Sequence, residues 1–112
     1  YHCYCHKTTR LITEKFNSIE IKTTFQSRFG PQEWLQPYTD KTLEKLPEEN
    51  KKNILVVCPG FASDCVETLE EISIEGKESF MESGGENFDF VPCLNDSDDH
   101  INLFEYLIKR YI

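Results

Sequence analysis

The feature that most restricts the fold is a continuous apolar run from Asn53 to Cys58, with the letters NILVVC, which stops at Pro59-Gly60. An unbroken run rich in β-branched residues is typical of a parallel strand buried on both faces. The Pro-Gly pair is a strong turn signal. We therefore expect residues 53–58 to form the central strand of a parallel sheet.

Helical and strand-like segments alternate on either side of this run. Hydrophobic spacing predicts helices at 1–16, 39–46, 64–83 and 97–111, and strands at 19–26, 53–58 and 88–91. Alternation of this kind indicates crossover helices and a parallel sheet covered on both faces. The expected fold class is α/β, a partial doubly wound domain with three strands and flanking helices.

The charge balance argues against one class of partner. Of 112 residues, 12 are basic and 20 are acidic, which gives a formal net charge of −8. Such a chain repels a phosphate backbone, so nucleic acid is not an expected partner.

The cysteine spacing and the length of the apolar runs indicate the cellular compartment and the relation to membranes. Five cysteines without the regular spacing of a disulfide framework fit reduced thiols in a cytoplasmic protein. The apolar runs are all shorter than the roughly 18 to 20 residues needed to cross a bilayer. We therefore expect a soluble, cytoplasmic piece that could still contact a membrane surface peripherally.

Three glutamates on the longest expected helix are the first candidate site. Glu67, Glu71 and Glu75 lie at i, i+4 and i+8, so their carboxylates share one helix face. Like charges at this spacing cost roughly 0.2 to 0.5 kcal/mol per pair, and a cation along the ridge would reverse that term. Hard oxygen ligands suit a divalent metal in transit. The alternative is a solvated acidic face whose Asp64-x-x-Glu67 spacing forms a capping box.

Trp34, the only tryptophan, is the second candidate. It lies in a loop bounded by Gly30-Pro31 and Pro37. In doubly wound sheets, ligands bind beyond the carboxyl ends of the strands, which directs attention to the loops that follow Gln26, Cys58 and Val91. Trp34 could anchor the packing of its loop, or it could face a flat apolar macrocycle.

The histidines give weaker signals. The first six residues read YHCYCH, but their spacing matches no standard zinc motif. Cys-x-Cys on a helix directs its side chains about 200° apart, so structural or surface roles are favoured. His100 follows acidic residues at the start of the last expected helix, where a surface position is expected.

Three long stretches together resemble ferrochelatases, most closely the bacterial members: FQSRFGPQEWLQPYTD at 25–40, CPGFASDCVETLEEI at 58–72 and PCLNDSDDHI at 92–101. The resemblance implies two similar flavodoxin-like domains, each with a four-stranded parallel sheet, and a porphyrin held in the cleft between them. Residues 1–112 would be an incomplete C-terminal domain, with the N-terminal domain of the same chain as its partner.

The resemblance also implies a reaction and its residues. A ferrochelatase is a lyase that inserts ferrous iron into protoporphyrin IX to form protohaem in haem biosynthesis. Glu67 would line the deepest part of the cleft and act in metal insertion or in removing pyrrole protons. Glu71 and Glu75 would extend the metal-binding ridge, and Trp34 would face the porphyrin plane. Iron is here a substrate, and no tightly bound cofactor is expected.

Some features depart from the family pattern. The key histidine of the family lies upstream of Tyr1, so residues 1–112 alone should be inactive. Cys65 stands where some members have a histidine. No cysteine cluster precedes Ile112, and no iron-sulfur cluster is expected. Two alternatives stay open: a related chelatase that uses another tetrapyrrole or metal, and a non-catalytic porphyrin- or metal-binding module.

Overall fold

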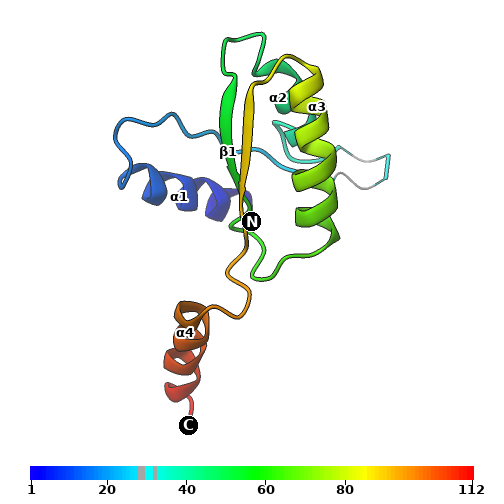
Figure 1. Cartoon of the computed structure of the whole chain (residues 1–112). Coiled ribbons are helices and arrows are strands. Elements are labelled where there is room, and N and C mark those ends of the chain that lie inside the picture. The colour runs from blue at the N-terminus through cyan, green and yellow to red at the C-terminus, as the bar shows by residue number, and fades with distance from the viewer. Residues whose placement is uncertain (28–29, 32) are drawn as a thin grey trace.

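The computed structural model describes residues 1–27, 30–31 and 33–112 (Figure 1). The helices and strands follow one another in the order α1 (His2–Thr13), α2 (Thr39–Lys45), β1 (Asn53–Val57), η1 (Glu67–Gly76), α3 (Lys77–Glu82), β2 (Asn87–Val91) and α4 (Asp98–Lys109). Every helix expected from hydrophobic spacing is present, with small differences at the ends.

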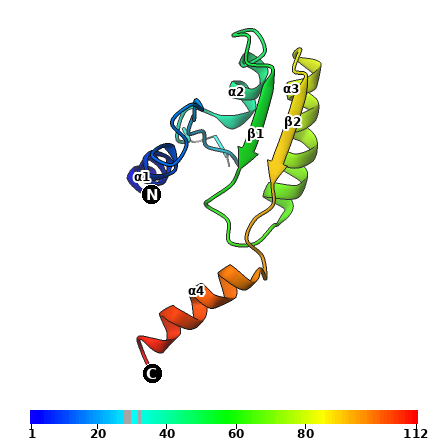
Figure 2. The same ribbon diagram turned by 60° about the vertical axis from the view of Figure 1, so that its left-hand side comes forward.

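The two strands form a parallel pair. Their register runs from Asn53 opposite Asn87 to Val57 opposite Val91. The connection between them is helical, because η1 and α3 join into one continuous helix alongside the strands (Figure 2). The structure thus confirms the parallel pairing with a helical crossover that the alternation of elements predicts.

The core lies between this helix and one face of the strands. Phe80 of α3 is fully buried, and its ring lies 5.9 Å from that of Phe88 on β2. Leu43 of α2 and Ile72 of η1 are also buried here. The strand residues that pack against this cluster alternate along each strand: Ile54, Val56, Phe88 and Phe90. Burial of these apolar side chains is the main force that holds the helix on the strands.

The third expected strand, at residues 19–26, is absent. Within the described chain the sheet has two strands, and Phe25 makes only an isolated parallel bridge to Tyr38. The Phe25 N–H donates to the Pro37 carbonyl at 2.9 Å, and its carbonyl accepts from the Thr39 N–H at 3.0 Å. The backbone hydrogen bonds of Phe25 are therefore directed to the segment before α2 and not to β1.

The expected burial of β1 on both faces is also wrong. Leu55 and Val57 are 66% and 49% exposed, while Ile54 and Val56 face the core. The helix formed by η1 and α3 covers one face of the strand, and the odd-numbered residues point away from it. An apolar sequence predicts a strand well, but the sequence alone does not say which neighbours cover it.

The long helix has an unusual first half. Residues Glu67–Gly76 are a π-helix, and α-helical geometry resumes only at Lys77. Pi-helical turns are rare and are frequently found at functional sites. The close approach of α2 depends on Gly76, because a Cβ atom there would lie 3.1 Å from the Leu43 side chain.

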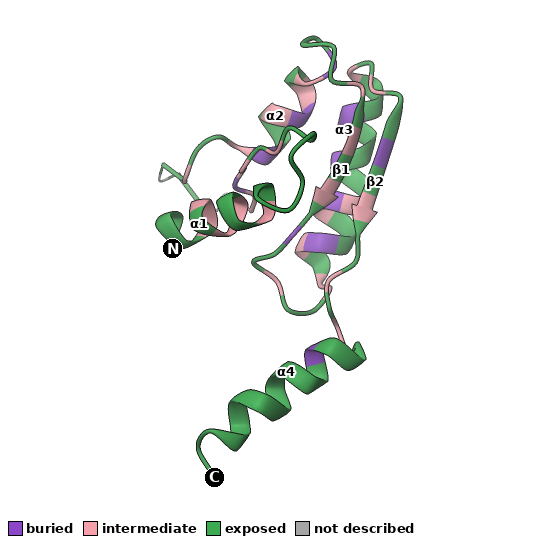
Figure 3. Cartoon of the chain, turned by 90° about the vertical axis from the view of Figure 1, so that its left-hand side faces the viewer, coloured by how far each residue is buried: buried purple, intermediate pink, exposed green. Residues whose placement is uncertain are grey.

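The last helix projects from the rest of the molecule (Figure 3). Its apolar side chains are exposed, among them Ile101, Phe104, Leu107 and Ile108. His100 is its one buried residue, so the expected surface position is wrong. The ring Nδ1 lies 2.6 Å from the Asn95 carbonyl, and the ring packs against Phe104 at 4.6 Å.

Candidate functional site

Gln26 connects the two separate parts of the sequence that carry candidate residues. Its side-chain Nε2 donates to the backbone carbonyl of Glu67 at 2.7 Å, and its own backbone carbonyl accepts from Trp34 Nε1 at 3.0 Å. Its Oε1 also accepts from the Cys58 thiol at 3.6 Å. Trp34 and Glu67 are therefore held near each other, beyond the carboxyl end of β1, as the sequence analysis expected for a ligand site.

Glu71 holds the neighbouring residue of the same loop. The two oxygens of its carboxylate accept hydrogen bonds from the backbone N–H and the hydroxyl of Ser27, each at 2.7 Å. Ser27 has a φ of 60°, a left-handed conformation that is uncommon for residues other than glycine. Backbone strain of this kind persists only where surrounding contacts enforce it, and it is concentrated at functional sites.

Glu67 begins the π-helix and is half-buried. A hydrogen bond from the Cys65 thiol lowers the pKa of its carboxyl group, and a hydrogen bond from its own backbone N–H adds to this effect. Desolvation opposes the shift weakly. Because both hydrogen bonds favour the charged form, Glu67 is a carboxylate at neutral pH.

Glu75 lies further along η1 and is exposed. The three glutamates follow one another along the helix and do not converge on a point. In the part of the chain that the structure describes, no group of three or more His, Cys, Asp or Glu side chains could hold a metal ion. A line of separate carboxylates offers a cation successive weak contacts and lacks the closed ligand set of a tight metal site.

Trp34 is held by a hydrogen bond and is only partly buried. The hydrogen bond from its Nε1 to the Gln26 carbonyl fixes the position of the ring. The side chain nevertheless stays 39% exposed, so part of the indole remains accessible. A fixed and accessible aromatic ring suits contact with a flat ligand.

Asp64 does not cap the helix in the way its spacing suggests. The start of η1 has no side-chain cap hydrogen bond. Instead the Asp64 carboxylate accepts hydrogen bonds from Asn95 Nδ2 and Thr68 Oγ1, both at 2.9 Å, and Asn95 Oδ1 accepts from the Asp64 N–H. These bonds lower the pKa of the Asp64 carboxyl group, the one from Asn95 most. Asp64 thereby ties the loop after β2 to the start of the helix.

Cys58 lies behind the site, at the end of β1. Burial raises the pKa of its thiol to about 11, with smaller contributions from nearby Cys93 and Asp64. The thiol is therefore protonated at neutral pH and able to donate to Gln26. Its role in the structure is to position Gln26, because a neutral thiol is a poor metal ligand.

Three residues whose side chains make hydrogen bonds in the candidate site are missing from the candidates predicted from the sequence. Gln26 and Cys58 appear there only as the ends of expected strands, and Ser27 is not considered, whereas the side chains of all three form hydrogen bonds here. Polar residues at the ends of strand-like segments were the available signal. The partners of these residues are 32 to 44 positions away in the sequence, a distance that local patterns do not encode.

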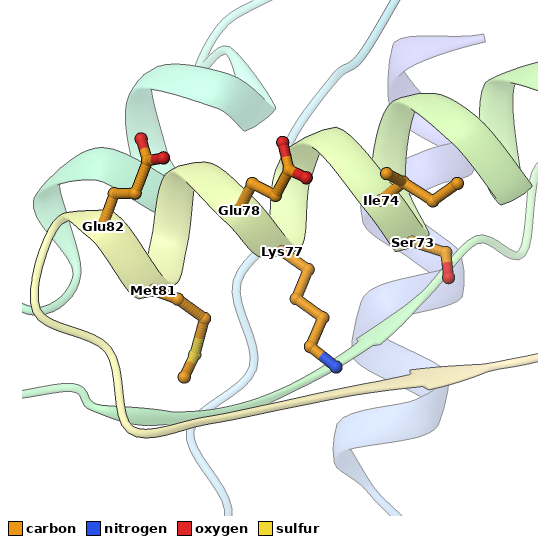
Figure 4. A pocket seen from close by; sticks show the side chains of 6 residues that line it. All are labelled: Ser73, Ile74, Lys77, Glu78, Met81 and Glu82. Carbon is orange, nitrogen blue, oxygen red and sulfur yellow. The ribbon is translucent and has the colours of Figure 1, made fainter.

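A separate open hollow lies on the other half of the long helix. Figure 4 shows Glu78 and Glu82 on one side of the helix and Lys77 and Met81 on the other. It is lined by Ser73, Ile74, Lys77, Glu78, Met81 and Glu82. Neither Trp34 nor Glu67 is among them, so this hollow is not part of the candidate site.

Comparison with known proteins gives a consistent result over the whole chain. The family model described as Ferrochelatase matches residues 1–112. The chain is 55% identical over 111 residues to the ferrochelatase of Marinobacter nauticus, covering 97% of this chain and 30% of that protein. It is 55% identical over 112 residues to that of Agrobacterium fabrum, covering 98% and 33%.

A third ferrochelatase, from Shewanella denitrificans, is 51% identical over 119 aligned positions, covering 100% of this chain and 35% of that protein. The chain thus spans about one third of the length of the curated relatives that it matches. The chain belongs to the ferrochelatase family.

Proposed function

We propose that the protein of which this chain is part is a lyase that inserts ferrous iron into protoporphyrin IX to form protohaem. Family membership supports the reaction, since the relatives carry the name ferrochelatase. The observation that carries the site is the hydrogen-bonded link from Trp34 through Gln26 to Glu67. Because Gln26 binds the backbone carbonyl of Glu67, this link holds an accessible aromatic ring close to the residue that carries the ionised carboxylate.

Metal insertion requires a group that contacts the porphyrin and a group that accepts its protons, and Trp34 and Glu67 can fill these two roles. Ferrous iron replaces two pyrrole N–H protons, so the porphyrin loses two protons for each iron bound and no electron is transferred. Glu67 as a carboxylate accepts a pyrrole proton and passes it to solvent, and its negative charge lowers the cost of stripping water from the incoming cation. Its lowered pKa keeps it in the charged state that both steps require.

The other candidates have supporting roles in this proposal. Glu75, which is exposed, meets iron first, and Glu71 passes it towards Glu67. Each oxygen of Glu71 already accepts one hydrogen bond from Ser27, which leaves further lone pairs for a cation. Trp34 contacts the face of the porphyrin. Iron is a substrate here, and we propose no tightly bound cofactor and no iron-sulfur cluster.

In this proposal, the fold also needs parts of the protein that lie outside residues 1–112. Residues 1–112 form part of a C-terminal domain with a doubly wound, flavodoxin-like sheet, and the N-terminal domain of the same chain supplies the opposite wall of the porphyrin cleft. The comparison supports this proposal, because the chain matches only about one third of the length of each relative and about two thirds of that length lies outside the match. Residues 1–112 alone are therefore expected to be inactive.

The cellular setting follows from the thiols and the charge. All five cysteines are free in the structure, which supports a reducing compartment such as the cytoplasm. A net charge of −8 disfavours nucleic acid as a partner. Among the described residues, no helix is both long enough and apolar enough to cross a membrane. The exposed apolar residues of α4 are the surface we propose for any peripheral membrane contact.

The test is metal insertion by the complete protein under anaerobic conditions. Protoporphyrin with Fe²⁺ should give the absorption spectrum of protohaem, at a rate well above that of the uncatalysed mixture. Parallel reactions use coproporphyrin with Fe²⁺ and an early tetrapyrrole with Co²⁺. Faster turnover of either pair would indicate a related chelatase. Porphyrin binding without insertion of any metal would indicate a non-catalytic module and contradict the proposal.

A further inference from the structure

Two histidines of α1 converge on one point. His2 and His6 lie one helical turn apart, and their Nε2 atoms are 3.1 Å from each other. No sequence motif for a metal site covers them, and the site proposed for porphyrin metallation does not use them. Two ring nitrogens that face each other either share a proton or bind the same cation.

The separation fits a metal chelate. Imidazole nitrogen lies roughly 2.0 to 2.1 Å from a bound Zn²⁺ ion. Two nitrogens 3.1 Å apart at that bond length subtend an angle of about 98° at the metal. This value lies between the roughly 90° of octahedral and the roughly 109° of tetrahedral coordination. The separation of the two nitrogens therefore matches that of two ligands of one ion.

Phe25 holds the two rings in place. The His2 ring stacks on it at 5.4 Å, and the His6 ring meets it edge-on at 6.1 Å. Phe25 is itself buried and fixed by its bridge to Tyr38. Because the rings rest on a rigid support, little side-chain entropy remains to be lost when an ion binds.

The ligand set identifies the kind of ion. Imidazole nitrogens favour zinc, copper, nickel and iron over calcium and magnesium. His2 is exposed, so water can reach the remaining coordination positions.

We propose that His2 and His6 bind one divalent first-row transition-metal ion through their Nε2 atoms, with water completing the coordination. With two protein ligands, the site takes up and releases its ion readily. Its residues are separate from Glu67, Glu71 and Glu75. A test of this metal site is therefore independent of a test of the proposed reaction.

Calorimetric titration of the complete protein with Ni²⁺, in a reducing buffer without porphyrin, tests this inference. His2→Gln and His6→Gln should each remove one binding event or weaken it by roughly tenfold or more, because the second nitrogen of a chelate binds at high effective concentration. Cys3→Ser, at an exposed neighbour on the same helix, should leave the titration unchanged.

A register control separates chelation from histidine content. The double substitution His6→Gln with Lys7→His keeps two histidines on α1 but places them at i and i+5, where the rings point apart. It should behave like His6→Gln alone. All three histidine changes lie on the surface of α1, which contributes no buried residue, so circular dichroism should show an unchanged fold. An isotherm identical to wild type in the folded single variants, or full binding in the register control, would overturn the proposal.

Discussion

At the scale of single residues, the hydrogen bond from the Cys65 thiol favours the charged form of the proposed catalytic group, Glu67. Cys65 stands two positions before Glu67 and its thiol is the largest cause of the lowered pKa of that carboxyl group. A thiol can stabilise the carboxylate without adding a positive charge that would repel an incoming cation.

Removal of this donor should alter the pH dependence of the reaction. In Cys65→Ala the carboxylate loses its thiol hydrogen bond, so the pKa of Glu67 rises and the acidic limb of the pH–rate profile moves to higher pH. Cys65→Ser, which retains a donor, should keep the limb near its wild-type position. The measurement is kcat for iron insertion as a function of pH. An acidic limb that is identical in the alanine and serine variants would contradict the role given to Cys65.

The five thiols should differ in reactivity. Cys3 is exposed, whereas the Cys58 thiol is buried and its pKa is raised to about 11 from 9.0. Iodoacetamide at pH 8 should modify Cys3 quickly and Cys58 only when the protein unfolds, as followed by peptide mass spectrometry. Above pH 9 the thiol ionises in the unfolded chain but not in the folded one, so its contribution to stability declines between pH 9 and 11. Rapid labelling of Cys58 in the folded protein would show that Gln26 lacks this buried neutral donor.

At the scale of elements, the sequence predicts helices and the parallel pair better than it predicts geometry within them. The run at 53–58 and the spacing of Val66, Leu69, Ile72 and Phe80 are strong local signals, and the structure has a strand and a helix there. The π-helical hydrogen bonding of Glu67–Gly76 has no such signal, because the apolar residues tolerate either winding. The pattern at 19–26 predicts a strand, but Phe25 bonds to Pro37 and Thr39 instead.

The end of the long helix depends on a glycine. A Cβ atom added at Gly85 would overlap the ring of Phe80, which is fully buried and cannot move aside. Gly85→Ala should therefore destabilise the protein by about 1 to 3 kcal/mol through overpacking. Gly60→Ala is the matched control, because its nearest neighbour, the Tyr1 hydroxyl, would be at an ordinary 3.4 Å. Urea unfolding of the complete protein measures both. Equal stability of the two variants would mean that the packing around Phe80 is looser than described.

At the scale of the whole molecule, large apolar side chains are exposed on two faces of the described chain. The uncovered face of β1 and the apolar side of α4 together expose large hydrophobic residues. Patches of this kind mark surfaces that contact another part of a protein, a partner or a membrane. The sequence indicates their apolar character, but it does not say what covers them, and the chain spans about one third of each relative that it matches.

The isolated chain should consequently associate with itself. Residues 1–112, analysed by light scattering, should form oligomers and bind a hydrophobic dye, and the complete protein should do so much less. Leu55→Thr should reduce the association, because Leu55 is exposed, whereas Ile54→Thr should lower stability instead, because Ile54 packs in the core. If the isolated chain is monomeric and binds no dye, the exposed face of β1 and the apolar side of α4 are stable in contact with water, and the prediction is wrong.

The most direct test of the central claim is the rate of ferrous iron insertion by the complete protein carrying Glu67→Gln, with Glu70→Gln as the control. Glutamine keeps the size of the side chain and removes its charge and basicity, and Glu70 is an exposed acid of the same helix with no assigned role. We predict a loss of roughly 10²- to 10⁴-fold in kcat for Glu67→Gln with porphyrin binding retained. We predict near-normal turnover for Glu70→Gln. Near-normal turnover in Glu67→Gln would contradict the account, since it would leave the Glu67 carboxylate without a part in the chemistry.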